Sequence, residues 1–225
     1  LEVDFSKRPE GTVPYTLPAV CPVCGGPTER DPDGAAIRCV SESCPAQKAR
    51  FLSHFASRDA MDIDGLGSAI VEQLTGEGLV ETPADLYHLT VEQLEPLDHM
   101  GAQSAKNLVA SIAKSKENDL WRLLFALGIR QVGAKAAKVL AQRFGTLENI
   151  QRASLEELTA VPDIGGITAG NIKSWFERPL NQKLIEELVA AGLNTKCLTE
   201  ISDQRFAGKT IVVTGTLEQM TRQEA

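Results

Sequence analysis

The sequence predicts a mainly α-helical protein in which a small zinc-stabilised β module precedes four tandem helix–turn–helix units. Four of the five cysteines lie in two close pairs within residues 21–44, which predicts the module. From about residue 53 to residue 193, short amphipathic stretches alternate with glycine, as is typical of short packed helices. Four similar turns recur there, and their last glycines are 34, 32 and 32 residues apart. Near-equal spacing indicates a repeated structural unit.

The cysteine cluster has the spacing Cys21-x2-Cys24-x14-Cys39-x4-Cys44. Two close pairs suit tetrahedral Zn²⁺, because each pair can supply two thiolates from one tight turn. The intervening DPDG at 31–34 has turn chemistry, so the span predicts a small β-hairpin. Four thiolates leave no position for water, and we therefore expect one structural zinc. Two disulfides or a redox pair are the alternatives, and the odd cysteine count of a cytosolic chain disfavours them.

The helical region contains a long internal repeat. Residues 82–101 align without a gap with residues 146–165, and the similarity continues beyond both segments at the same offset of 64. Thr82 before Pro83, Thr90 and Ser154 have the chemistry of helix N-caps. Trp and Phe residues fall on apolar helical faces, where we expect them to belong to the core.

The repeated turns have the form x-x-apolar-Gly followed by a helix. Glycine permits a sharp turn and lets a ligand approach the backbone. We expect the apolar residue to pack between the two helices, and the amides that begin the second helix to face an anion such as a DNA phosphate. The predicted DNA-binding residues are these turn glycines and nearby bases: Gly65, Gly67, Gly101, Lys106, Arg130, Gly133, Lys135, Lys138, Gly165 and Gly166.

Two alternatives remain for these residues. The turns could be compact connections in which glycine only ends a helix, and each basic residue taken singly could be a solvated surface charge. Four turns at near-equal spacing favour the phosphate-binding interpretation.

The charge distribution is polarised although the net charge is −7. Residues 61–100 carry nine acids and no Lys or Arg, whereas residues 101–145 carry eight bases and two acids. We therefore expect a polyanion to meet the middle of the chain, and Gly67 to be the weakest of the four turns for DNA. The sequence contains no apolar run long enough to span a membrane and no signal peptide, which predicts a cytoplasmic protein without membrane contact.

The last residues change character. The β-branched run within 209–214, followed by Thr-Gly-Thr, predicts the first strand and turn of a further α/β domain. The absence of an initiator Met and the abrupt end predict a fragment of a longer protein.

The order of these modules resembles the C-terminal half of bacterial NAD-dependent DNA ligase. Stretches such as RPEGTVPYTLPAVCPVCG, FASRDAMDIDGLG, LFALGIRQVG and FAGKTIVVTGTL carry the resemblance. It implies the tail of an oligonucleotide-binding domain at 1–18, a four-Cys zinc finger at 19–50 and a helix-hairpin-helix domain at 51–197. A linker at 198–204 and the start of a BRCT domain at 205–225 would follow. The four-residue gap of the second cysteine pair departs from the five expected for this family.

The resemblance implies an enzyme that seals nicks in duplex DNA during replication and repair, with NAD as AMP donor and Mg²⁺ as helper. The family's adenylylated lysine lies in a K-x-D-G motif that this chain lacks. We therefore expect this fragment to bind neither NAD nor Mg²⁺, to be inactive alone, and to bind nicked duplex as a monomer without reading sequence. The alternatives are a helix-hairpin-helix module of another repair protein, either a nuclease or a junction binder, or a protein-interaction module that uses the acidic 61–100 face.

Overall fold

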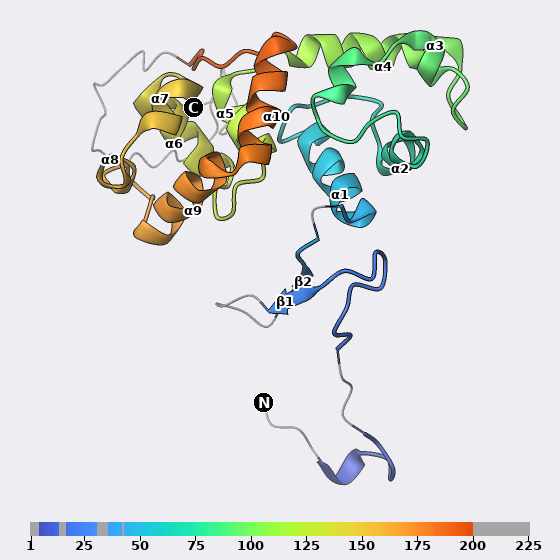
Figure 1. Cartoon of the computed structure of the whole chain (residues 1–225). Coiled ribbons are helices and arrows are strands. Elements are labelled where there is room, and N and C mark those ends of the chain that lie inside the picture. Colours follow the sequence, from blue (N-terminus) through green and yellow to red (C-terminus); the bar gives the residue numbers. More distant parts are fainter. Residues whose placement is uncertain (1–4, 14–16, 31–35, 42, 200–225) are drawn as a thin grey trace, which may run out of the picture.

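The computed structural model describes residues 5–13, 17–30, 36–41 and 43–199. This part contains ten α-helices, two 3-10 helices and two short strands, which confirms the predicted fold class. Figure 1 shows the β module below a broad helical body, with α1 leading from one to the other. The turn at 31–34 and the strand predicted near the C-terminus lie outside the described residues.

The β module is small and has little apolar interior. After the 3-10 helix η1 (Phe5–Lys7), β1 (Thr28–Arg30) pairs antiparallel with β2 (Ile37–Cys39). Among the described residues of 17–44, only Cys21 and Cys44 are buried. A segment of this size cannot be held by apolar burial alone, so its stability must come from the cysteine cluster.

The first helix joins the β module to the helical body. α1 (Pro45–Ala56) begins directly after Cys44, which occupies the N-cap position, with proline at the first helical position. Its other end carries Leu52 and Phe55, which are buried in the main core. The predicted domain boundary at residue 50 therefore falls inside one continuous helix.

The helical body contains four hairpins in which two helices pack against each other. In chain order they are α1 with α2 (Ser68–Gly76), α3 (Val91–Leu94) with α4 (Ala102–Ser115), α5 (Leu120–Ala126) with α6 (Ala134–Phe144), and α8 (Leu155–Thr159) with α9 (Gly166–Glu177). We number them hairpins 1 to 4.

The internal repeat corresponds to a hairpin together with the short helix before it. The 3-10 helix η2 (Asp85–His88) precedes hairpin 2, and α7 (Leu147–Arg152) precedes hairpin 4. The last helix, α10 (Pro179–Ala190), packs against α9. In Figure 1, hairpins 3 and 4 lie to the left, α2 to α4 lie to the right, and α10 crosses between them.

The apolar residue of each turn packs inward as predicted. Leu66, Val132 and Ile164 are buried, and Met100 is partly buried against the same core. The core is continuous through all four hairpins. The turns therefore have a fixed shape, because each is anchored by an apolar side chain between its two helices.

Two of the three predicted N-caps are confirmed. The Ser154 hydroxyl accepts the Glu157 amide (3.1 Å), and Thr90 is the N-cap of α3. Thr82 is wrong as a helix cap, because the helix there begins later, at Asp85. The Asp85 carboxylate accepts the Thr82 amide instead (2.8 Å), which closes the preceding turn.

A strap formed by residues 193–199 ties the two halves of the helical body together. Its main chain hydrogen-bonds to residues 116–120 on one side and to residues 145–147 on the other. The Asp119 carboxylate caps α5 and also accepts the Thr199 amide (3.0 Å). The predicted linker from 198 onward therefore starts within a hydrogen-bonded part of the fold.

Candidate nucleic-acid interface and metal centre

The four clustered cysteines meet at one point. The Sγ atoms of Cys24 and Cys39 are 3.6 Å apart, those of Cys21 and Cys44 are 4.0 Å apart, and all four lie within 4.8 Å of one another. A tetrahedral zinc with Zn–S bonds of about 2.3 Å separates its sulfurs by roughly 3.8 Å. The cluster therefore has the dimensions of a closed four-thiolate zinc site, and all four residues are free cysteines.

Main-chain amides surround the sulfurs. The amide of Gly26 donates to Cys24 Sγ and the amide of Ser41 donates to Cys39 Sγ, both at 3.4 Å. Backbone hydrogen bonds from Cys24 and Val23 lower the pKa of Cys21 to about 7. The hydrogen bond from the Ser41 amide also lowers the pKa of Cys39, but burial and the neighbouring thiols outweigh it and raise that pKa to about 11. Donors of this kind favour the thiolate, which is the form that binds a metal.

The last glycine of every hairpin turn is the N-cap of the second helix. Its φ lies between −76° and −109° and its ψ near 170°, values that any residue can adopt. A Cβ built at any of these positions would meet nothing within 4 Å. The fold therefore does not require glycine at Gly67, Gly101, Gly133 and Gly165.

Glycine at these N-caps leaves the start of each second helix open. A Ser, Thr or Asp would have used its side chain to accept an amide, and would have been a better or equal cap. With glycine, the first amides of α2, α4, α6 and α9 have no capping side chain. Each exposed helix start combines free amide donors, a positive dipole end and no Cβ, which is the arrangement that accepts a phosphate.

The residue two before each N-cap glycine adopts a left-handed backbone. In hairpin 1 this is Gly65, with φ of 87°, and in hairpins 2 to 4 it is His99, Gln131 and Asp163, with φ from 61° to 65°. The four turns therefore share one backbone shape despite different sequences. Gly166, the first residue of α9, is exposed and unobstructed like Gly165.

Hairpins 1 and 2 are joined side by side. The side chain of Gln73 on α2 exchanges two hydrogen bonds with the main chain of Asp98 in the second turn, at 2.7 and 3.3 Å. The Asp64 amide donates to the Ser111 hydroxyl on α4 (2.8 Å). These contacts fix the two helix starts relative to each other.

Hairpins 3 and 4 are joined by reciprocal contacts between their tips. Lys135 of hairpin 3 forms an ion pair with Asp163 of hairpin 4 at 2.7 Å. In the other direction, the Thr168 hydroxyl of hairpin 4 donates to Gln131 of hairpin 3 (3.4 Å). A further bond runs from the Asn171 amide group to a main-chain carbonyl of the third turn, at 3.3 Å.

The predicted basic residues have different surroundings. Lys106 is exposed near the start of α4, and Arg130 is exposed in the third turn. Lys135 is exposed on the first turn of α6, and the hydrogen bond and charge of Asp163 raise its pKa. Lys138 lies one turn further along, with its ammonium 4.5 Å from the centre of the Trp121 ring. The first three are therefore grouped at hairpin tips, whereas Lys138 faces the strap.

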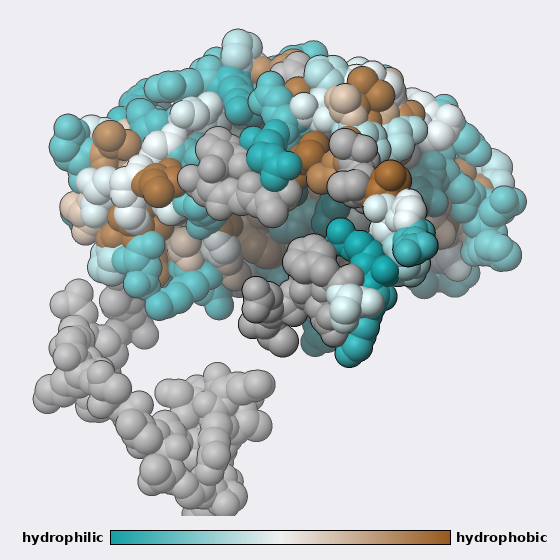
Figure 2. Space-filling model, turned by 90° about the horizontal axis from the view of Figure 1, so that it is seen from below, coloured by the Kyte–Doolittle hydropathy of each residue, from teal (hydrophilic) through white to brown (hydrophobic). Residues whose placement is uncertain are grey.

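The acidic segment covers hairpin 1 and its surroundings. Eight of its nine acids are exposed, and only Asp85 is partly buried. Within the described residues, one ion pair ties this surface to a base, from Glu81 to Lys48 (3.1 Å). Figure 2 shows hydrophobic residues scattered among hydrophilic ones on the face seen from below. Because exposed acids surround the start of α2, it has the least favourable setting of the four helix starts for a polyanion.

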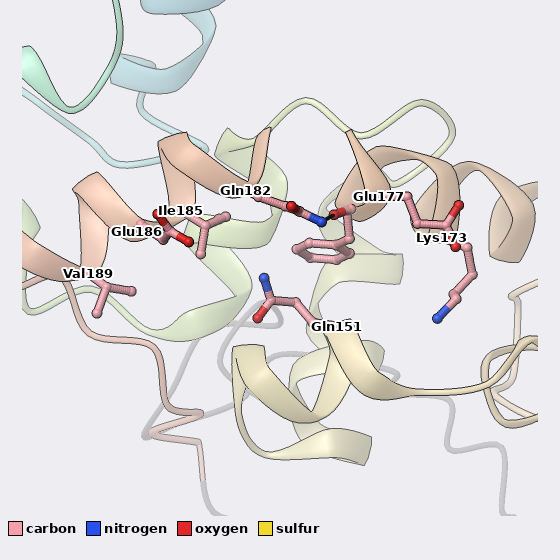
Figure 3. Close-up of a pocket in the computed structure, with 8 residues that line it drawn as sticks. Gln151, Lys173, Glu177, Gln182, Ile185, Glu186 and Val189 are labelled. Atoms are coloured by element: carbon pink, nitrogen blue, oxygen red, sulfur yellow. Dashed lines mark hydrogen bonds between the residues drawn. The ribbon is translucent and has the colours of Figure 1, made fainter. Parts of the chain in front are cut away.

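A pocket of about 440 Å³ lies between α7, α9 and α10, away from the hairpin tips. Figure 3 shows Gln151 facing Gln182, with Ile185 and Val189 along α10. Gln182 donates to a main-chain carbonyl of α9 (3.0 Å), and Lys173 donates to the Ala153 carbonyl (3.0 Å). These polar groups hold helices together and do not converge on a common point.

The cross-hairpin residues Gln131, Asp163 and Gln73 were not predicted. Gln131 and Asp163 share one signal in the sequence, the position two before the turn glycine, whereas Gln73 lies within α2 and has no such signal. No helix in the described part of the chain is both long and apolar enough to span a bilayer.

Comparison with known proteins assigns a family to three segments. Residues 20–46 match the NAD-dependent DNA ligase C4 zinc finger domain. Residues 57–114 match the SAM-like helix-hairpin-helix tandem, which covers hairpins 1 and 2 except for α1 and the last residue of α4. Residues 122–185 match the helix-hairpin-helix motif.

The whole chain is similar to bacterial proteins named DNA ligase. It is 48% identical over 225 residues to one from Carboxydothermus hydrogenoformans, which covers all of this chain and 34% of the relative. The similarity to one from Bacillus subtilis is 48% over 217 residues, 94% of this chain and 32% of the relative. The chain thus spans about a third of the length of the curated relatives it matches.

Proposed function

Because the chain is homologous along its whole length to part of the bacterial DNA ligases, we propose that it is the DNA-holding part of an NAD-dependent ligase. The whole enzyme would join a 3′-hydroxyl to a 5′-phosphate at a nick in duplex DNA. In that enzyme NAD supplies AMP and Mg²⁺ assists. This chain lacks a K-x-D-G motif, so the adenylylated lysine would belong to another part, and the fragment alone would be inactive.

The observation that carries this proposal is the set of N-cap glycines that the fold itself does not need. Glycine at such a position makes sense if the backbone of a ligand approaches the helix start closely. A duplex presents phosphates at regular intervals, and four fixed helix starts can contact several of them together. Such contacts hold the duplex without reading its sequence.

The four cysteines would bind one structural zinc in this proposal. Cys21, Cys24, Cys39 and Cys44 supply four thiolates and no open position, so the metal would hold the module together and take no part in the reaction. Zinc would also fix Cys44 at the start of α1, and thereby connect the module to hairpin 1.

The ligase assignment is favoured over another helix-hairpin-helix repair protein by the zinc finger match, which carries the ligase family's own description. The protein would act in the cytoplasm as a monomer on nicked duplex.

Duplex binding at several salt concentrations tests the proposal. The fluorescence anisotropy of labelled nicked duplexes of two unrelated sequences would be measured with the zinc-loaded chain. We expect equal affinity for both sequences and a fall of at least about tenfold between roughly 50 and 200 mM salt. The proposal would be contradicted by an affinity that does not depend on salt concentration, by a strong difference between the two sequences, or by a preference for four-way junctions over nicked duplex.

A further inference from the structure

The ion pair between Lys135 and Asp163 occupies the place where two proposed phosphate sites adjoin. Lys135 is the second residue of α6 and stands two residues after the N-cap Gly133. Asp163 stands two residues before the N-cap Gly165 of the neighbouring hairpin. A carboxylate at this point is unexpected on a surface that binds DNA, because it repels phosphates.

The ion pair is accessible and easily exchanged. The Lys135 side chain is 81% exposed and that of Asp163 is 56% exposed, although their charged atoms are 2.7 Å apart. Exposed ion pairs contribute little to stability, so a phosphate could replace the carboxylate as the partner of Lys135 at low cost.

The hairpins do not depend on this ion pair to stay together. Thr168 donates to Gln131, and Asn171 donates to the Arg130 carbonyl, across the same junction. The corresponding positions of hairpins 1 and 2 are Ala69 and His99, which form no ion pair. The structural need for Asp163 is therefore small, and its charge calls for another explanation.

We propose that Asp163 weakens DNA binding by forming an ion pair with Lys135, which lasts until a duplex phosphate displaces the carboxylate. This inference rests on the proposed function. In the free protein the carboxylate neutralises Lys135. In the complex Lys135 turns to a phosphate, and the released carboxylate faces the negatively charged backbone. Asp163 thereby weakens binding twice, by competing for the lysine and by repelling the DNA, which suits an enzyme that must release its product.

Asp163→Asn tests the proposal with little risk to the fold. Asparagine tolerates the left-handed backbone at least as well as aspartate, and the other two cross-hairpin bonds remain. We expect nicked-duplex affinity to rise roughly fivefold at low salt. The control is Glu148→Gln, which removes a carboxylate from the similarly exposed Glu148–Arg152 pair on α7. That control should change affinity by less than about twofold.

Lys135→Gln in both backgrounds separates competition from a general change of charge. In the wild-type background it should cost little affinity, because Asp163 already holds the lysine. In the Asp163→Asn background it should cost several-fold more. Unchanged or weaker binding by Asp163→Asn, or equal costs of Lys135→Gln in the two backgrounds, would overturn the inference alone. Failure of the wild-type chain to bind any duplex would instead overturn the proposed function, and this inference with it.

Discussion

Gly65 and Gly67 flank Leu66 in the first hairpin, and their backbones differ. Gly65 has φ of 87°, which side chains rarely adopt, whereas Gly67 has φ of −76°. A Cβ at Gly65 would find ordinary contacts with Leu108, so a side chain there would be opposed by backbone strain rather than by crowding. At Gly67 neither strain nor crowding opposes a side chain, so the fold does not require glycine there.

This difference predicts opposite behaviour of two neighbouring substitutions. Gly65→Ala should lower the free energy of unfolding by about 1–2 kcal/mol, because alanine is strained in the left-handed region. Gly67→Ser should leave it within about 0.5 kcal/mol of wild type, since serine is a good N-cap. Urea unfolding followed by circular dichroism measures both. Equal destabilisation by the two changes would show that both glycines serve the fold.

The elements were largely predictable from the sequence. The helical spacing of apolar residues and the spacing of the turn glycines predicted the hairpins, because each hairpin depends on local chemistry: an apolar anchor, a turn and a cap. Ser154 and Thr90 cap helices as expected, whereas Thr82 does not, since the helix after it begins only at Asp85 and the Thr82 hydroxyl donates to the Asp85 carboxylate. The zinc module was predictable from cysteine spacing alone, although its fusion to α1 was not.

Removal of zinc tests whether the metal holds the β module and the start of α1 together. A strong chelator should release one zinc per chain, measured by native mass spectrometry. Amide hydrogen exchange should then accelerate in residues 20–48, because Cys44 no longer fixes the start of α1. Exchange in α6 and α9 should stay unchanged, since these helices pack mainly against α5, α7, α8 and α10. No acceleration in 20–48 would contradict a structural zinc, and Cys44→Ser should reproduce the chelator's effect.

Contacts between hairpins could not be predicted, because they join residues far apart in the sequence. The residues around Lys135 do not indicate that Asp163 lies beside it. The residues around Lys138 likewise do not indicate that its ammonium lies over the Trp121 ring. The sequence therefore located the turns of the candidate interface, while the fold decided which charges are available at them. For the same reason a count of bases overstates how many can contact DNA.

On the scale of the whole molecule, the helical body presents four helix starts in two joined pairs. The strap of residues 193–199 connects the half that contains hairpins 1 and 2 to the half that contains hairpins 3 and 4. Acids surround the first helix start, the second has Asp98 before it and Lys106 after it, and bases gather near the third. We therefore expect DNA to lie mainly across hairpins 2 to 4. Hairpin 1 would instead support the zinc module through α1.

In the proposed complex, backbone amides at the N-cap glycines hold the duplex. The most direct test compares nicked-duplex affinity of Gly133→Val with that of Lys106→Gln and Lys135→Gln, with Gly67→Val as the matched control in acidic surroundings. A Cβ at Gly133 meets no neighbouring atom, so valine there should cost at most about 1 kcal/mol of stability. We predict that Gly133→Val weakens binding at least about tenfold, and more than either lysine change or Gly67→Val. Equal losses for Gly133→Val and a single lysine neutralisation would contradict the claim.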